Sequence, residues 1–261
     1  MAYYKTLQER KLRQEIVEMG RRLWQRGFVA ANDGNISARL GENILLTTPT
    51  GVSKGFMTPE MLLRVDMEGN VLNRDTGWRP SSELKMHLEV YRQREDVAAV
   101  VHAHPPYSTA FAVAGIPLDQ CALAEAVFTL GSVPIAPYAT PSTQGIPESI
   151  RPLVQHSDAI LLANHGALTL GTEVLAAYFR METLEHAAQI IFLSRQLGQT
   201  ETLSREEVEK LMVLREKAGV PGRITPCRTQ PDSVQSGELE AVVREITRAV
   251  LERLRTGKSE E

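Results

Sequence analysis

The chain has 261 residues, of which 43% are hydrophobic and 23% are charged, a composition that is ordinary for a globular protein with a sizeable core. Its formal net charge of -3 provides no broad positive field, so we expect a small charged metabolite as partner and no nucleic acid. It contains no run of about 18 apolar residues and no apolar leader after Met1, so we expect a cytoplasmic protein with no membrane contact.

The chain has two cysteines, Cys121 and Cys227, which lie far apart and in no metal-binding or redox spacing. We therefore expect neither a disulfide nor a thiolate zinc site. Free thiols suit the reducing conditions of the cytoplasm.

The first half of the chain alternates predicted helices with short apolar strands. Apolar residues recur at three- and four-residue steps over 6–27, which indicates an amphipathic helix that ends at Gly27. A second helix over 81–94 begins with the hydroxyl caps Ser81 and Ser82. The other predicted elements of this half are a strand at 44–49, a helical turn at 58–62, a tight turn at 67–71 and a strand at 96–104.

The second half is dominated by longer helical patterns. In order, the sequence predicts a helix at 106–115, a Pro-rich loop at 132–149 leading into a helix at 147–156, a strand at 158–164, and helices at 173–197 and 204–218. A stretch rich in Pro, Thr and Ser at 221–237 is typical of a linker. The amphipathic helix predicted at 238–255 could pack against a neighbouring subunit.

Two histidines, His102 and His104, stand one residue apart in the predicted strand at 96–104. Alternate residues of a strand point to the same face, so both imidazoles can bind one metal ion. Two structural histidines with ordinary hydrogen bonds are the alternative. His165 and Glu83 also stand at the ends of predicted elements, and three histidines with one carboxylate can hold a metal while leaving a position open for substrate.

Small and hydroxyl-bearing residues form three turns, at 32–37, 48–55 and 80–83. The third lies at a predicted helix N-terminus, where free amides and the helix dipole attract anions. Each turn taken alone could be purely structural. Together they indicate neutral donors for a phosphate group in a chain without a large basic patch.

Five short motifs occur in the order "DGNIS", "TPTG", "SSE", "HAH" and "NHG" over residues 8–200. In this combination the chain resembles the class II aldolase and adducin family, whose enzymes include L-fuculose-1-phosphate aldolase and L-ribulose-5-phosphate 4-epimerase. The resemblance implies an α/β fold with three α/β/α layers around a mostly antiparallel sheet. It also implies a homotetramer with active sites between subunits, and a catalytic domain over 1–220 followed by a linker and helix over 221–261.

The resemblance also implies roles for individual residues. A zinc ion, or manganese in its place, would be bound by His102, His104 and His165 together with Glu83, which also moves protons. The substrate phosphate would be bound by the first three motifs, with contacts from Gly34, Asn35, Thr50, Gly51, Ser81 and Ser82.

Two details of the sequence bear on the reaction. The residue after the paired serines is Glu83, as in the aldolases, where the epimerases carry Asp. The catalytic Tyr of the fuculose phosphate aldolases has no counterpart in 119–128, so we expect Glu125 to serve as the second acid or base, with a surface carboxylate as the alternative. The resemblance thus implies an aldehyde-lyase that cleaves a fuculose, 5-deoxyribulose or methylthioribulose type of ketose 1-phosphate to dihydroxyacetone phosphate and an aldehyde.

Other readings remain open at this point. A decarboxylase, dehydratase or 4-epimerase of the same fold would use a similar metal centre. A non-catalytic assembly module like the adducin head is the third reading, and the four intact ligand residues argue against it.

Overall fold

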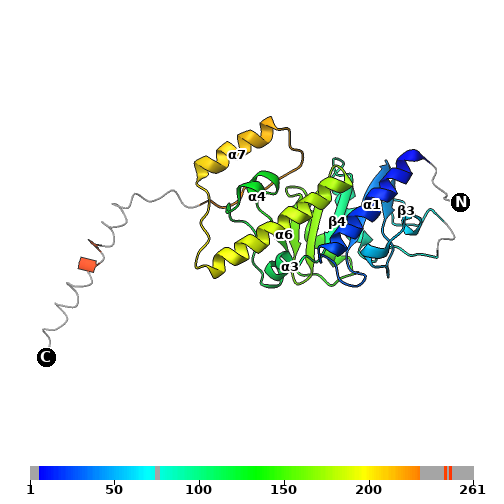
Figure 1. Cartoon of the computed structure of the whole chain (residues 1–261), viewed down its shortest axis with the longest axis horizontal. Coiled ribbons are helices and arrows are strands. Elements are labelled where there is room, and N and C mark those ends of the chain that lie inside the picture. Colours follow the sequence, from blue (N-terminus) through cyan, green and yellow to red (C-terminus); the bar gives the residue numbers. More distant parts are fainter. Residues whose placement is uncertain (1–5, 74–76, 230–243, 246, 249–261) are drawn as a thin grey trace, which may run out of the picture.

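The computed structural model describes residues 6–73, 77–229, 244–245 and 247–248. In these residues one sheet of seven strands has the order β3-β2-β1-β4-β7-β6-β5. Figure 1 shows this sheet with helices packed along it. All neighbouring strands are antiparallel except β5 and β6, which are parallel. The strands are β1 (Asn35–Gly41), β2 (Ile44–Thr47), β3 (Leu63–Val65), β4 (Ala99–Ala103), β5 (Ile135–Ala136), β6 (Ala159–Leu162) and β7 (Gly166–Gly171).

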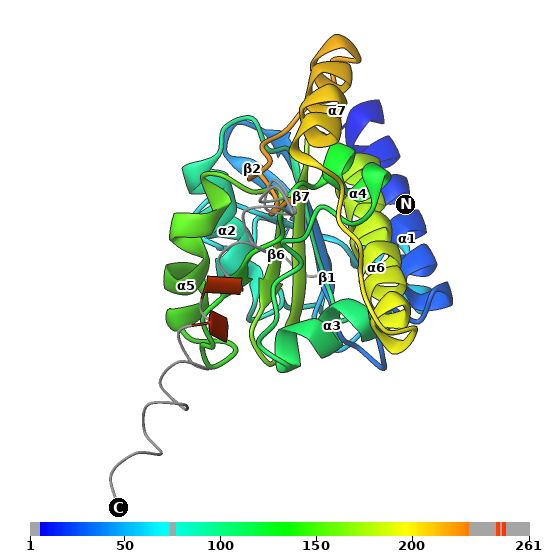
Figure 2. The same cartoon turned by 90° about the vertical axis from the view of Figure 1, so that its left-hand side faces the viewer.

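Helices cover both faces of this sheet, which confirms the three predicted layers (Figure 2). One face carries α1 (Leu7–Gln25), α3 (Pro106–Val113) and α6 (Val174–Gln196), and the other carries α2 (Leu84–Gln93) and α5 (Gly145–Val154). The remaining helical elements are η1 (Lys54–Phe56), η2 (Pro59–Met61), α4 (Ala124–Thr129) and α7 (Arg205–Lys217). Among the described helices, none combines the length and the apolarity that a bilayer crossing requires.

The strand β4 lies in the middle of the sheet, and all five of its residues are buried. Val101 packs in the apolar cluster shared with α1 and α6, whereas Val100 packs in the cluster shared with α2 and α5. A strand covered on both faces reads as a continuous apolar run, which is why the stretch at 96–104 is easy to recognise in the sequence.

Within the described residues the predicted helices and the three predicted apolar strands are present, but four of the seven strands were not foreseen. Two of these, β3 and β5, are only three and two residues long. β1 begins at Asn35, inside the stretch predicted only as a turn, and it is paired with β2 and β4. β7 is a separate strand that follows a tight turn after β6. Both strands mix glycine and polar residues with apolar ones, so their strand character comes from pairing on both sides.

The expectation that the cysteines are unpaired was wrong. Cys121 and Cys227 form a disulfide across a sequence separation of 106 residues. The pairing is possible because the segment 221–229 lies against the loop before α4, where the Cys121 amide donates to the Arg228 carbonyl at 3.0 Å. Spacing in the sequence carries no information on a contact made by two such distant segments.

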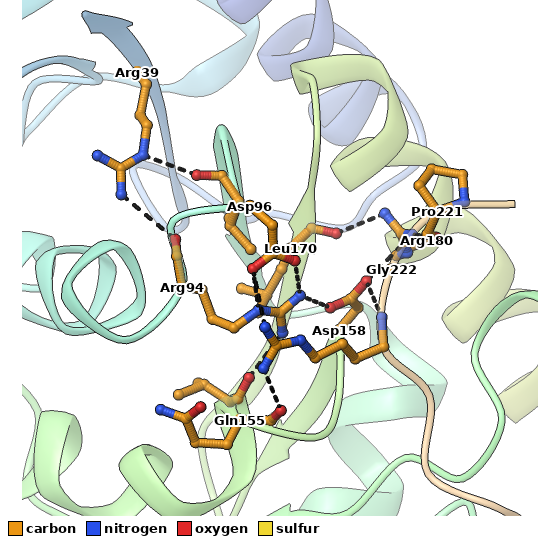
Figure 3. A network of polar contacts seen from close by, with 12 residues as sticks. Arg39, Arg94, Asp96, Gln155, Asp158, Leu170, Arg180, Pro221 and Gly222 are labelled. Carbon is orange, nitrogen blue, oxygen red and sulfur yellow. Dashed lines mark hydrogen bonds and ion pairs between the residues drawn. The ribbon is translucent and has the colours of Figure 1, made fainter. Parts of the chain in front are cut away.

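A buried ion network holds the same segment at a second point (Figure 3). Arg94, 1% exposed, donates to Asp96 and, at 2.9 Å, to Asp158. Asp158 also lies 3.3 Å from Arg180 and accepts the Arg223 amide at 3.1 Å. Arg180 in turn donates to the Pro221 carbonyl at 2.7 Å.

The described part of the predicted linker, 221–229, is therefore packed against the domain. The predicted helix at 238–255 lies almost entirely outside the described residues, and it stays a prediction together with the domain boundary at 220.

We expect Cys227→Ser to lower the free energy of unfolding by about 2–4 kcal/mol, because the disulfide closes a long loop in the unfolded chain. Urea unfolding of the oxidised protein measures the difference. The matched control is the wild-type protein treated with dithiothreitol, which should unfold like the variant. An unfolding midpoint that neither reduction nor substitution changes would contradict the pairing.

Candidate functional site

Three histidines and one carboxylate meet at one end of the sheet. His102 is on β4, paired with Asn35 of β1 and Leu168 of β7, and His104 follows directly after the strand. His165 lies in the turn between β6 and β7, and Glu83 lies at the N-cap of α2. Ligand atoms of the three imidazoles all lie within 4.8 Å of one another.

The protonation of the histidines fits a metal ion. His102 Nδ1 lies 2.9 Å from the Ala167 carbonyl, which can only accept, so this nitrogen carries a hydrogen and Nε2 is the nitrogen that faces the cluster. His104 Nδ1 faces the Asp33 carboxylate at 3.3 Å, and its Nε2 faces His102.

The Nε2 atoms of His102 and His104 lie 3.1 Å apart. Nitrogens about 2.0–2.1 Å from a tetrahedral zinc ion would be about 3.3 Å apart, so the spacing suits a divalent metal.

Glu83 completes the cluster as a carboxylate. Its oxygens lie 3.4 Å from His102 Nε2 and 3.0 Å from His165 Nε2, and the Asn35 amide donates to it at 3.0 Å. Burial by itself would raise the pKa of Glu83, but the His102 charge and the contacts with His102 and His165 hold that pKa well below its usual range. The side chain is therefore negative, as a metal ligand and a proton acceptor must be.

His104 is neutral at physiological pH. Burial, together with the neighbouring His102 and His165, lowers the pKa of His104 to about 4. A neutral imidazole is the form that binds a metal ion.

Two glycines in the motifs make room for this geometry. A side chain at Gly34, which has a φ of +71°, would come within 2.8 Å of the His102 carbonyl oxygen. A Cβ at Gly166 would lie 2.5 Å from His104 Cδ2 and 2.6 Å from the Ala103 carbonyl oxygen. Both positions therefore exclude a side chain so that the metal-binding strand end can be approached closely.

An open cleft of about 250 Å³ adjoins the cluster. It is lined by Asn32, Asp33, Gly34, Pro49, Thr50, Ser81, Ser82, Glu83, His104, Pro141, Ser142 and His165. The turns around Thr50 and Ser81 are tied together, since the Thr50 amide donates to the Arg79 carbonyl at 2.9 Å. Among the described residues the lining contains hydroxyl groups, the two carboxylates Asp33 and Glu83, and no Lys or Arg side chain, so an anion would be held there by neutral donors.

Most of the candidate phosphate-binding residues therefore line one cleft, and two of them, Asn35 and Gly51, do not. Asn35 is buried beneath the cleft, where its amide group contacts Glu83 and Ser81. Gly51 is exposed at a φ of +73° and does not line the cleft. These residues meet the requirements of an anion site, and their contact with phosphate stays a prediction.

Glu125 lies apart from the cluster. It is exposed on α4, which packs against α6 and α7, and it does not line the cleft. The assignment of Glu125 as the second acid or base stays a prediction, and within one chain this carboxylate does not reach the metal ligands.

Sequence reasoning missed several residues of the site. Asp33 orients His104, and Ser142 donates to the Ser82 hydroxyl at 2.7 Å from a strained backbone with a φ of 70°. Lys54 is buried and donates to the carbonyls of Asn32 and Val52 at 3.0 and 2.8 Å, which joins the first two turns. The motif "NDGNIS" contains Asp33, but nothing in the sequence singles out Lys54 or Ser142.

Comparison with known proteins gives consistent results. The model of the class II aldolase and adducin N-terminal domain matches residues 14–192. The chain is 34% identical over 183 residues to an L-fuculose phosphate aldolase of Methanococcus maripaludis, covering 70% of this chain and 97% of the relative. It is 35% identical over 189 residues to a 3-oxo-tetronate 4-phosphate decarboxylase of Pectobacterium atrosepticum, covering 71% of this chain and 85% of that relative. A solved structure of an L-fuculose 1-phosphate aldolase matches with a TM-score of 0.73 and 29% identity, over 80% of this chain and 96% of that one.

We expect the purified protein to bind one divalent ion per chain. Loss of an outer hydrogen-bond partner of a ligand weakens metal binding by up to about 100-fold, so His102→Ala, which removes a ligand itself, should weaken it by at least about 100-fold. Metal analysis after dialysis against a weak chelator measures this. His156→Ala, a change at an exposed histidine, is the matched control and should keep its metal. Equal metal content in both variants would exclude the cluster as the binding site.

Proposed function

Because the chain belongs to the class II aldolase and adducin family, we propose that it is a divalent-metal-dependent aldehyde-lyase acting on a ketose 1-phosphate. The observation that carries the proposal is the cluster of Glu83, His102, His104 and His165 directly beside the hydroxyl-lined cleft. Zinc is the proposed ion, and the donor set also accepts manganese.

The phosphate would bind at the start of α2. Ser81, Ser82 and Thr50 present hydroxyls to the cleft, and the positive end of the helix dipole faces the same space. Binding energy from this remote group would fix the reacting carbons beside the metal ligands, so it should act on turnover as well as on affinity.

The proposed reaction breaks the bond between C3 and C4 of the sugar. A bound divalent ion would supply Lewis-acid stabilisation of the negative charge that develops on the C2 oxygen. The C4 hydroxyl loses its proton as C4 becomes the aldehyde carbon, and the electron pair of the broken bond remains on C3. Glu83 returns a proton to C3 in cleavage and removes it in the reverse condensation.

The group that takes the C4 hydroxyl proton is the open part of this proposal. Glu125 would have to reach the cleft from a neighbouring copy, which is compatible with the homotetramer that we propose from the resemblance. The pocket formed around Glu125 in that assembly would also determine which aldehyde is released. The choice among fuculose, 5-deoxyribulose and methylthioribulose types therefore depends on the assembly.

Decarboxylation is the second candidate, favoured by the similarity of 35% to a 3-oxo-tetronate 4-phosphate decarboxylase. Loss of carbon dioxide next to a carbonyl leaves the same kind of enolate charge, so one metal centre and one phosphate cleft serve both reactions. Epimerisation is less favoured, because Glu83 stands where the epimerases carry Asp.

The first experiment is an assay for dihydroxyacetone phosphate release from L-fuculose, 5-deoxyribulose and methylthioribulose 1-phosphates, with and without chelator. We expect chelator-sensitive release from at least one of them. A 3-oxo-tetronate 4-phosphate is assayed in parallel for carbon dioxide. If the metal-loaded protein releases carbon dioxide and no dihydroxyacetone phosphate, the lyase proposal is replaced by the decarboxylase.

We expect Glu83→Gln to lower kcat by about 10²–10⁴-fold, the usual effect of losing a general acid or base. The variant keeps the shape of the side chain but cannot move the C3 proton. Exchange of the C3 proton of dihydroxyacetone phosphate with solvent measures this step by itself. Glu216→Gln, at an exposed position on α7, is the control and should exchange at the wild-type rate.

A further inference from the structure

Two sets of polar side chains connect β1 to α2 beneath the metal ligands. The Asn35 amide donates to Glu83 at 3.0 Å. Two residues further along β1, the Ser37 hydroxyl contacts His87 Nδ1 at 2.7 Å and the Tyr91 hydroxyl at 2.9 Å. Two strand residues span about 6.6 Å and four helical residues span about 6 Å, so the Asn35–Glu83 and Ser37–His87 pairs lie side by side.

The hydrogens of the inner set run in one direction. Burial raises the pKa of Tyr91, so its hydroxyl is protonated. The backbone of Val100 lowers the same pKa, which is the effect of a group that donates a hydrogen bond to the phenol oxygen. The Tyr91 hydrogen is then donated to Ser37, and the Ser37 hydrogen is donated to His87 Nδ1. Burial lowers the pKa of His87 to about 3, so the ring is neutral and its one hydrogen is on Nε2.

In the part of the chain that the structure describes, each of the two pairs has a buried polar atom without a partner. Among the described residues, neither His87 Nε2 nor Asn35 Oδ1 has a hydrogen-bond partner, although both atoms are buried. Leaving such a group unpaired costs about 1–3 kcal/mol. Side chains of a helix lean toward its N-terminus, so the His87 ring leans from its own turn toward the turn of Glu83.

One water molecule placed between these two atoms would satisfy both of them. A water can accept from His87 Nε2 and donate to Asn35 Oδ1, and two such bonds span about 5.5 Å. A donor at Asn35 Oδ1 also fixes which way the carboxamide points. The flipped amide would direct its oxygen at the negative Glu83, which is repulsive, and would leave its NH2 group facing a donor.

We propose that His87 is a positioning residue for Glu83, acting through a buried water and the Asn35 carboxamide. The Tyr91 and Ser37 hydroxyls set the tautomer of His87, His87 sets the orientation of Asn35, and Asn35 holds the carboxylate in line for proton transfer at C3. This inference rests on the proposed function for the role of Glu83, whereas the hydrogen-bond chain itself does not.

The kinetic test compares variants that keep or remove the donor. We expect His87→Phe to lower kcat by about 10–100-fold at unchanged metal content and nearly unchanged KM, which is the range for an outer partner of a ligand. His87→Gln retains a donor and should recover most of the loss. Tyr91→Phe should lose a part of kcat, whereas Tyr178→Phe, which removes another tyrosine hydroxyl bonded to Glu182, is the matched control and should lose none.

Wild-type kcat in His87→Phe, or a loss of kcat that follows the loss of bound metal, would overturn the proposal. If His87→Phe does not fold, the ratio of the kcat of Tyr91→Phe to the kcat of Tyr178→Phe tests the proposal instead. Equal kcat values in those two variants would overturn the proposal.

A second readout does not depend on substrate. Nitrogen chemical shifts of the ¹⁵N-histidine-labelled, metal-loaded protein report each tautomer, and we expect His87 to carry its hydrogen on Nε2 and to exchange it slowly. A hydrogen on Nδ1 would overturn the chain. If no sugar phosphate reacts with the wild-type protein, the proposed function fails, and the His87 tautomer still tests the chain on its own.

Discussion

The hydrogen bond from His102 Nδ1 to the Ala167 carbonyl links the metal cluster to the sheet on which the molecule is built. His102 is fully buried on the central strand β4, so its imidazole cannot be hydrated and must be satisfied by the protein and a ligand. Because Ala167 belongs to β7, the bond fixes the ring against both central strands. The position of Nε2, and hence of any metal, follows from the strand register.

The helix α2 supplies most of the remaining chemistry from one short segment. The residues that lead into it, Ser81, Ser82 and the N-cap Glu83, line the cleft, and His87 and Tyr91 on its following turns contact Ser37 of β1. This interface with β1 is polar, whereas the opposite face of the sheet packs apolar residues from α1 and α6. We infer that the polar interface gives the carboxylate a defined orientation that apolar packing alone would not provide.

The end of the sheet away from the site carries a buried ion network and a disulfide. β4 and β7 run antiparallel, so the beginning of β4, near Arg94, adjoins the end of β7, and Asp158 precedes β6 at the same end. The network around Asp158 and the disulfide of Cys121 with Cys227 both hold the segment 221–229 there. No residue of 221–229 lines the cleft beside His104 and His165.

Periodicity in the sequence determined most of the helices and the apolar strands β2, β4 and β6, and the five short motifs determined which residues could meet at a site. The tertiary structure decided that β1 begins at Asn35, that Cys121 pairs with Cys227, and that Glu125 lies outside the cleft of its own chain. It also placed Asp33 against His104 and His87 against Ser37. Helix and strand patterns reflect interactions within a few residues, whereas these contacts join segments far apart in the chain and depend on strand register and packing.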